Sequence, residues 1–351
     1  MSRSTIFDVA ELAGVSIKTV SRVVNREPNV RASTRERVEK AIAELNYRPD
    51  QSARNLASHR SHLIGLVYDD PGAYELPSSG YIISMQQGAL KACRSARSEL
   101  LIHPCNYRDK DVAARLESLI EETRPAGIIL AAPLSNMPKI VRAIEATRTP
   151  YVRVSPGNKK DKHLSVATND REISAEMTRY LASLGHKRIA FITGHPSHKA
   201  VANRLLGYQD GLRDSGIEFS EELVAAGDNS FGSGEACAEQ LLDLEEPPTA
   251  IFAANDDMAV GVIRVADRRG IHVPRQLSVA GFDDIPLARQ IYPALTTIRQ
   301  PLTEMAECAA EMLVKRKSEK ETAKDFEVVP ATLQIRDSTG PAPEQASVHD
   351  D

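Results

Sequence analysis

The sequence has no tryptophan, few aromatic residues, no long apolar run and only four cysteines in 351 residues. The cysteines are Cys93, Cys105, Cys237 and Cys308. Because none of them forms a CxxC pair, a zinc ribbon and a thioredoxin-like motif are excluded, and free thiols in a reducing compartment are the simplest account. No stretch approaches the ~18 apolar residues of a membrane span, and the early acids Asp8 and Glu11 argue against a secretory signal. We therefore expect a cytoplasmic protein with no membrane partner.

Motifs for nucleotides and metals are missing as well. No GxxxxGKS/T segment occurs, and Cys237 takes the place of the third glycine after Gly232 and Gly234 in a possible GxGxxG. His195 and His198, in GHPSH, could suggest a metal site, but no second ligand pair accompanies them, so a loop or ligand contact is favoured. We expect no metal ion and no cofactor.

Three pairs of neighbouring carboxylates lie at the ends of β-rich runs, where acid–base chemistry is conceivable. They are Asp69/Asp70, Asp256/Asp257 and Asp283/Asp284. The same positions suit hydrogen bonding to ligand hydroxyl groups or helix capping, and no activated nucleophile accompanies them. We expect no catalytic residues, and an enzyme of sugar metabolism is the less favoured alternative.

Charge is unevenly distributed along the chain. The net charge is -4, but residues 1–60 carry 11 Lys and Arg against 7 Asp and Glu, and the remainder carries 33 against 41. Only the first segment leans toward a polyanionic partner such as DNA, although many excesses of this size are simply solvated surfaces.

The stretch from Thr5 to Asn25, TIFDVAELAGVSIKTVSRVVN, predicts two short helices. Thr5 can cap the first helix, with Asp8 at its third position. Gly14 can adopt the left-handed conformation of a tight turn, and Ser16 can cap a second helix that runs to about Asn25. Two helices joined in this way form a helix-turn-helix.

The second of these helices has two faces. One face is formed by Val20, Val23 and Val24, and we expect Val9, Leu12 and Val15 beneath it. The other is formed by Ile17, Lys18, Ser21, Arg22 and Asn25. This outward stripe suits a major groove, because Arg22 can bond a guanine edge twice and Ile17 can contact a thymine methyl group. The alternative is an amphipathic helix with a solvated polar face.

A third helix should begin with an S-x-x-E capping box, Ser33 to Glu36, and end near Asn46. Residues 50–61 are polar and mildly basic, and they form a linker that can become helical. Ala53 and Leu56 are its apolar pair, and an exposed leucine on a basic linker resembles a minor-groove wedge. A flexible tether is the alternative.

From His62 onward, short β-rich runs alternate with helical stretches, which is typical of parallel sheets with helical crossovers. The runs are 62–68, 99–104, 126–132 and 150–154, followed by 164–168, 188–194, 223–227, 250–255 and 277–284. Two such series predict two lobes, with a small-molecule site in the cleft outside the carboxyl ends of their strands. Residues 339–351 have little to bury and are expected to be disordered.

Eight ordered segments resemble the LacI/GalR family of bacterial transcriptional regulators. They are TIFDVAELAGVSIKTVSRVVN, TRERVEKAIAELNYRPD, LGHKRIAFITG, RLLGYQDGL, PPTAIFAANDDMAVG, LSVAGFDDIPLA, LTTIRQPLTEMA and VVPATLQIRDST. The resemblance spans about Ser4 to Ser338. It implies an N-terminal all-α helix-turn-helix headpiece (1–49), a hinge helix (50–61) and an α/β periplasmic-binding-protein-like core of two parallel-sheet lobes (62–338). The implied N-lobe is about 62–167 and 299–326, and the implied C-lobe is about 168–298 and 327–338.

The resemblance also implies a homodimer that binds pseudo-palindromic, double-stranded operator DNA. Ile17 and Lys18 look like the main base-discriminating pair, with Arg22 as a further base contact and Leu56 as the wedge. The full set of expected DNA-binding residues is Thr5, Ser16, Ile17, Lys18, Ser21, Arg22, Asn25, Ala53 and Leu56. Asp50 stands where many members have Asn, and an acid is less comfortable there beside phosphate.

In the cleft, the resemblance places eight residues at or near a small effector. They are Tyr81, Arg153, His198, Arg204, Phe231, Asn255, Asp283 and Gln300. An aromatic face with acids and amides suits a sugar. Arg153 stands where many members have an acid, and its convergence with Arg204 and His198 would favour an anionic sugar derivative. The alternative is that Arg153 pairs with Asp283 or another acid and leaves a neutral site.

These features together predict a ligand-controlled transcription factor, expected to be a repressor, in which the core switches the headpieces and hinges. A binding-only sugar protein would not need the segment from Thr5 to Asn25 and should carry an export signal.

Overall fold

The structure is a computed structural model that describes residues 4–24, 28–47, 61–69, 79–157, 163–318 and 325–343. The chain divides into two compact units, Met1–His62 and Leu63–Asp351. Asn25, Ala53 and Leu56 lie outside the described residues, as does nearly all of the expected hinge at 50–61. None of the helices in the described ranges combines the length and apolar character needed to cross a membrane.

The first unit contains three helices, α1 (Ile6–Ala13), α2 (Ile17–Val24) and α3 (Ala32–Glu44). Their buried side chains form one small core, made of Val9, Ala10, Ala13, Val20, Val23, Val38 and Ala41. Leu12, which we expected in this core, is 48% exposed. The buried face of α1 is centred on Val9, Ala10 and Ala13, and Leu12 lies about 100° around the helix from that centre.

Local capping explains where the first two helices begin and end. Thr5 and Asp8 form the predicted capping box, and Gly14 adopts the left-handed conformation with φ 60°. The Thr19 amide donates to Ser16 Oγ at 3.2 Å, so Ser16 caps α2 as predicted. The box predicted at Ser33 is wrong, because α3 begins at Ala32 after Arg31 and Ser33 is therefore already inside the first turn.

The second unit contains two six-stranded sheets, and each sheet is the centre of one lobe. The first sheet has the order β11-β5-β4-β3-β1-β2, and all its strands are parallel. Its strands are β1 (Leu63–Asp69), β2 (Glu99–Cys105), β3 (Gly127–Leu130), β4 (Tyr151–Val154), β5 (Ser165–Ala167) and β11 (Phe326–Val328).

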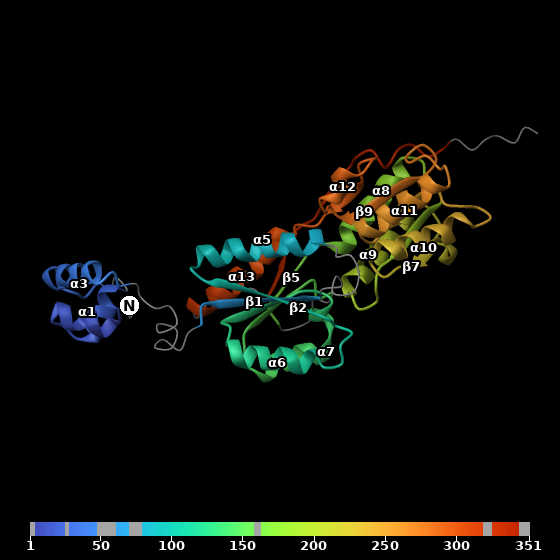
Figure 1. The fold of residues 1–351 in the computed structure, drawn as a ribbon. Coiled ribbons are helices and arrows are strands. Elements are labelled where there is room, and N and C mark those ends of the chain that lie inside the picture. Colours follow the sequence, from blue (N-terminus) through green and yellow to red (C-terminus); the bar gives the residue numbers. More distant parts are fainter. Residues whose placement is uncertain are drawn as a thin grey trace, which may run out of the picture. The chain divides into compact units, whose positions relative to one another are not determined.

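Helices cover both faces of this first sheet (Figure 1). On one face lie α5 (Ser79–Ser95) and α13 (Leu302–Ser318). On the other lie α6 (Val112–Thr123), α7 (Pro138–Ala146) and the short η2 (Leu134–Asn136). Helices α5 and α13 pack very closely at Gly88, where an added Cβ would lie 1.9 Å from the carbonyl oxygen of Thr303.

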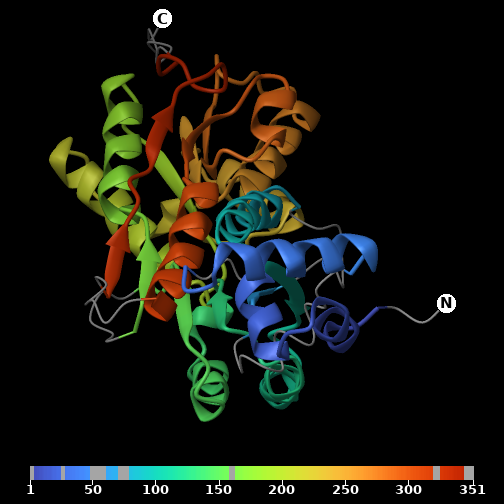
Figure 2. The ribbon, with the colours of Figure 1, turned by 90° about the vertical axis from the view of Figure 1, so that its left-hand side faces the viewer.

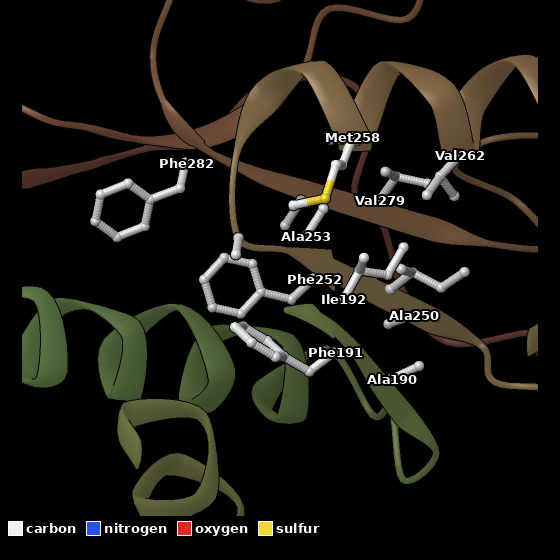
Figure 3. Close-up of a cluster of buried hydrophobic side chains, with 14 of the residues drawn as sticks. Ala190, Phe191, Ile192, Ala250, Phe252, Ala253, Met258, Val262, Val279 and Phe282 are labelled. Atoms are coloured by element: carbon white, nitrogen blue, oxygen red, sulfur yellow. The ribbon is translucent and has the colours of Figure 1, made fainter. Parts of the chain in front are cut away.

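The second sheet has the order β12-β10-β9-β8-β6-β7 and is parallel except for its edge strand β12. Its strands are β6 (Ile189–Thr193), β7 (Val224–Ala226), β8 (Ala250–Ala253), β9 (Ser278–Asp283), β10 (Thr296–Arg299) and β12 (Thr332–Gln334). The accompanying helices are α8 (Asp170–Ser183), α9 (Lys199–Asp214), η3 (Glu221–Leu223), α10 (Phe231–Leu242), α11 (Asp256–Arg268) and α12 (Leu287–Gln290). Figure 3 shows the core under α11, where Phe191 of β6 meets Phe252 of β8 edge to face at 5.2 Å.

The chain crosses between the two sheets three times, after β5, after β10 and after β11. Figure 2 shows the last crossing, where the red C-terminal segment carries β11 along one sheet and β12 along the other. Strand β11 pairs with β5 as far as Val328, so this crossing comes slightly later than the expected boundary near residue 326. The short elements β10, β11, β12 and α12 were absent from the sequence prediction, whereas each of the nine predicted runs overlaps a strand.

The prediction that disorder begins at residue 339 is wrong for residues 339–343, which bond to the second lobe. The Thr339 hydroxyl bonds to those of Tyr180 and Thr296, and the Ala342 amide donates to the Leu184 carbonyl at 2.8 Å. Gly340 approaches the buried His186, whose Nε2 lies 3.1 Å from the Gly340 carbonyl oxygen. Residues 339–343 therefore complete the second lobe, because they satisfy buried polar groups that would otherwise lack partners.

Candidate functional site

The second helix of the first unit exposes a compact set of side chains. Ile17 is 41% exposed, Lys18 and Arg22 are also exposed, and the opposite face carries the buried Val20 and Val23. The two buried valines anchor α2 in the headpiece core, so the side chains on the outer face of α2 have a fixed backbone beneath them. Of the remaining expected DNA contacts, Thr5 and Ser16 are exposed and cap α1 and α2, and Ser21 is half-buried.

A cavity of about 820 Å³ lies in the second unit, at the carboxyl ends of strands from both sheets. Residues that end or follow β1 to β4 line it from the first lobe, and residues that end or follow β6 to β10 line it from the second. Seven of the eight residues expected at an effector lie on its wall. They are Tyr81, His198, Arg204, Phe231, Asn255, Asp283 and Gln300.

Arg204 of α9 organises the buried side of this cavity. Its Nε donates to Asp170 Oδ1 at 3.0 Å, and its Nη1 donates to the Ala254 carbonyl at 2.5 Å. Its Nη2 lies 3.4 Å from Gln300 Oε1, and the guanidinium lies over the Phe282 ring at 3.5 Å. The guanidinium is thus held on several sides, and Asp170 already neutralises much of its charge.

Asp283 is the unsatisfied acid of the cavity. Its Oδ1 is buried with no hydrogen-bond partner among the described residues, and the nearest cationic group, Arg204 Nη2, is 3.8 Å away. Burial raises the pKa of Asp283 to about 7, and Arg204 offsets only part of that effect. Its φ of 116° shows that the backbone at the end of β9 is also strained. A buried acceptor without a donor is poised to receive one from a ligand.

The neighbours of two other wall residues, Asn255 and His198, determine which hydrogen bonds each can offer. Asn255 caps α11, because its Oδ1 accepts from the Met258 amide at 3.0 Å while its Nδ2 donates to the Asn229 carbonyl at 2.8 Å. Burial, followed by the nearby charge of Arg204 and the proximity of His195, lowers the pKa of His198 to about 4. His198 is therefore neutral at pH 7 and offers hydrogen bonds rather than charge.

Arg153 does not line the cavity, so its predicted convergence with Arg204 and His198 is wrong. It is buried in β4, and its Nε donates to the Ser135 carbonyl at 2.7 Å. The buried guanidinium of Arg153 is therefore held against η2. Ser155 lines the cavity wall instead, because it follows the end of β4 and turns out of the strand with a φ of 52°.

The charged side chains that do line the cavity carry more negative than positive charge. Four carboxylates face two guanidinium groups, and these residues are Asp69, Asp228, Asp257, Asp283, Arg108 and Arg204. This balance suits donors, such as hydroxyl groups, better than an anion.

Sequence reasoning missed Tyr107 and Arg108, whereas for His195 it favoured a loop or ligand contact over a metal site. Tyr107 Oη lies 3.1 Å from His195 Nε2, and the described residues hold no group of three side chains that could bind a metal. His195 directly follows the predicted run 188–194, and Tyr107 and Arg108 come shortly after the run 99–104. That position, at the carboxyl end of a parallel strand, was the signal that could have found them.

A headpiece with an exposed second helix and a two-lobed core with a cavity at its strand ends define a DNA-binding regulator that responds to a small molecule. Residues 5–50 match the model described as bacterial regulatory proteins, lacI family, and residues 178–339 match the periplasmic binding protein-like domain. The regulator GalR of Escherichia coli (strain K12) is 32% identical over 99% of this chain and 98% of its own length. The chain belongs to the LacI family of bacterial transcriptional regulators, as the sequence resemblance implied.

Two solved structures agree with this assignment. The lac repressor dimer bound to operator and the anti-inducer ONPF has a TM-score of 0.80 and 28% identity, covering 97% of this chain and 100% of that one. The complex of transcriptional regulator CelR with cellobiose has a TM-score of 0.74 and 30% identity, covering 96% and 100%. The predicted fold class, a helix-turn-helix headpiece with a two-lobed core, is confirmed.

Proposed function

We propose that this protein is a homodimeric repressor that binds a pseudo-palindromic operator and is controlled by a neutral, hydroxyl-rich carbohydrate in the inter-lobe cavity. It would act in the cytoplasm, where operator DNA is found, and it would bind its effector without turning it over. The observation that carries the effector class is the unpartnered Asp283 Oδ1 on a wall with an excess of acids. Sugar hydroxyl groups are donors of the kind such a wall lacks.

The aromatic side chains support the same class. Phe231 begins α10, and Tyr81 lies on α5 of the opposite lobe, so each lobe contributes an aromatic residue to the wall. An apolar face beside hydrogen-bonding groups is the usual composition of a small-molecule site. Arg153, on which an anionic effector depended, is absent from the wall, which supports a neutral sugar over a sugar acid.

The experiment for the effector combines a thermal-shift screen of neutral sugars and their uronic acids with operator binding. We expect a neutral sugar to raise the melting temperature and to change operator affinity, while its uronic acid binds more weakly. An acid that binds tighter than every neutral relative would contradict the proposed class. Conversion of a sugar by the purified protein would contradict a regulator that performs no catalysis.

For DNA reading, we propose that Ile17 and Lys18 discriminate bases and that Arg22 donates to a guanine edge. Their exposure on a helix held by Val20 and Val23 supports this proposal. Thr5, Ser16, Ser21 and Asn25 would add contacts to phosphate or bases. Ala53 and Leu56 stay sequence-based proposals for a hinge that enters the minor groove.

The test is selection of binding sites from random DNA with the wild type, the Ile17→Ala/Lys18→Ala double variant and the control Lys40→Ala, which changes an exposed lysine of α3. We expect the double variant to return a different motif and the control to return that of the wild type. Recovery of one motif by all three proteins would show that the two residues do not read the operator.

A further inference from the structure

Among the described residues, one hydrogen-bonded pair of side chains connects a loop of the first lobe with a loop of the second at the cavity wall. Tyr107 follows β2 of the first lobe, and His195 follows β6 of the second. Their polar atoms, Tyr107 Oη and His195 Nε2, are 3.1 Å apart, and the rings meet edge to face with centroids 5.6 Å apart. Both residues are half-buried and both line the cavity. A change in the separation of the lobes would therefore alter this contact directly.

The direction of the hydrogen bond follows from the neighbours of His195. The Ser197 amide donates to His195 Nδ1 at 3.1 Å, so Nδ1 must act as an acceptor. The proton of the neutral ring is therefore on Nε2, and Nε2 donates to Tyr107 Oη. Arg108 Nε donates to the same phenol oxygen at 3.2 Å.

Both partners of the Tyr107 oxygen are thus donors, so the phenol proton has no acceptor among the described residues. The backbone around it is also fixed. The Tyr107 amide donates to Asp69 Oδ1 at 3.1 Å, and the Arg108 amide donates to Asn106 Oδ1 at 2.8 Å. A held phenol with an unused proton at a cavity wall is a preorganised donor.

We infer that Tyr107 and His195 form a latch between the lobes that favours their closed arrangement, and that the Tyr107 hydroxyl group donates to an acceptor oxygen of the effector. Tyr107 would touch the effector, whereas His195 would position Tyr107 from the opposite lobe. The inference rests on the proposed function in taking the cavity as the effector site. It adds a donor to a wall on which Asp283 offers an acceptor, and it links occupancy of the cavity to closure of the lobes.

The latch is tested first without any ligand. Spin labels at Arg142→Cys of α7 and Glu218→Cys of the second lobe, both exposed positions, report the distance between lobes in a Cys308→Ser background. Loss of one hydrogen bond should lower the ratio of closed to open molecules roughly three- to tenfold in Tyr107→Phe and in His195→Ala. The double variant should match Tyr107→Phe, because the contact is already lost.

Tyr151→Phe is the matched control. Tyr151 also bonds to a histidine, His163 Nδ1 at 2.9 Å, but both residues belong to the first lobe. Its distance distribution should equal that of the wild type. A Tyr107→Phe distribution identical to that of the wild type would overturn the latch.

The donor is tested by calorimetry with cellobiose and with ribose as the probes. Tyr107→Phe should weaken binding of a sugar that the wild type binds by roughly three- to tenfold. His195→Ala should weaken it in the wild-type background and have no further effect in the Tyr107→Phe background. Additive losses would overturn the positioning role of His195. If the wild type binds neither sugar, the effector class proposed above loses support, and the distance measurement still decides the latch.

Discussion

The raised pKa of Asp283 predicts that effector affinity depends on pH in a range where few carboxyl groups titrate. The carboxyl group of Asp283, whose pKa is about 7, accepts from hydroxyl donors much more strongly when it is ionised. At pH 6 about one-tenth of Asp283 is ionised and at pH 8 about nine-tenths. Affinity for a neutral sugar should therefore rise about tenfold between pH 6 and pH 8, or by roughly 1.4 kcal/mol. His198, with its pKa lowered to about 4 by burial, stays neutral throughout this range.

The pH dependence of folding stability has the opposite sign to the pH dependence of sugar affinity. Burial raises the pKa of Asp283 above its unfolded value of about 3.9, so the folded protein holds the proton more tightly. The resulting stabilisation is fully present below that unfolded value and is lost as pH rises through 7. Asp283→Asn should therefore raise the melting temperature at pH 8 while it weakens sugar binding there.

The assay is calorimetry at pH 6, 7 and 8, repeated in two buffers with different ionisation enthalpies. Binding at pH 7 should release about half a proton, and Asp283→Asn should abolish both this release and the pH dependence. Asp267→Asn, at an exposed position of α11, is the charge-matched control. Because His195 also lines the cavity, His195→Ala is a second control. The pH dependence of sugar affinity should persist in this variant. Equal wild-type affinity at pH 6 and pH 8, with no effect of buffer, would refute the reasoning.

Two further predictions concern packing and capping. Thr5→Ala removes the hydroxyl group that accepts from the Asp8 amide and should destabilise the headpiece by about 1 kcal/mol, measured as faster amide exchange in α1, whereas Ser33→Ala, which caps nothing, should have little effect. Gly88→Ala places a methyl group against the Thr303 carbonyl and should destabilise the core by roughly 1–3 kcal/mol in urea, whereas Gly232→Ala, with open space around its Cβ, should not.

Local rules were sufficient for the headpiece because its signals lie within a few residues of one another. Thr5 with Asp8, and Gly14 before Ser16, fix both helix starts and the turn through bonds to nearby backbone. The prediction that Leu12 is buried was wrong because its burial depends on which side of α1 meets the other helices. Several rotations of a short apolar helix satisfy the same spacing of apolar residues.

In the core, the alternation of β-rich runs with helices predicted nine strands but not β10, β11 and β12. Pairing with distant partners, such as β11 with β5, decides the structure of these three strands. The cavity followed from the strand ends, but the direction of Arg153 did not. The sequence places Arg153 near the end of a strand and therefore near the cleft, but its guanidinium bonds to the Ser135 carbonyl of η2, which is a contact that the strand pattern does not reveal.

The Tyr107–His195 pair was beyond sequence reasoning for a similar reason. The two residues are 88 positions apart, and neither lobe alone brings them together. Only the fold defines which of the many loop residues at strand ends face one another.

The three crossings between the sheets also constrain when each unit can fold during synthesis. The headpiece core is complete once Val38 and Ala41 have been made. The first lobe, in contrast, needs Leu302, Met305 and Leu313 of α13 for its core and β11 for its edge. A chain that has emerged only as far as β5 exposes the surface that α13 will cover, although most of the sheet is present. The headpiece can therefore fold early on the ribosome, whereas this lobe must wait until nearly the whole of the second has been translated, which makes that interval its greatest exposure to aggregation.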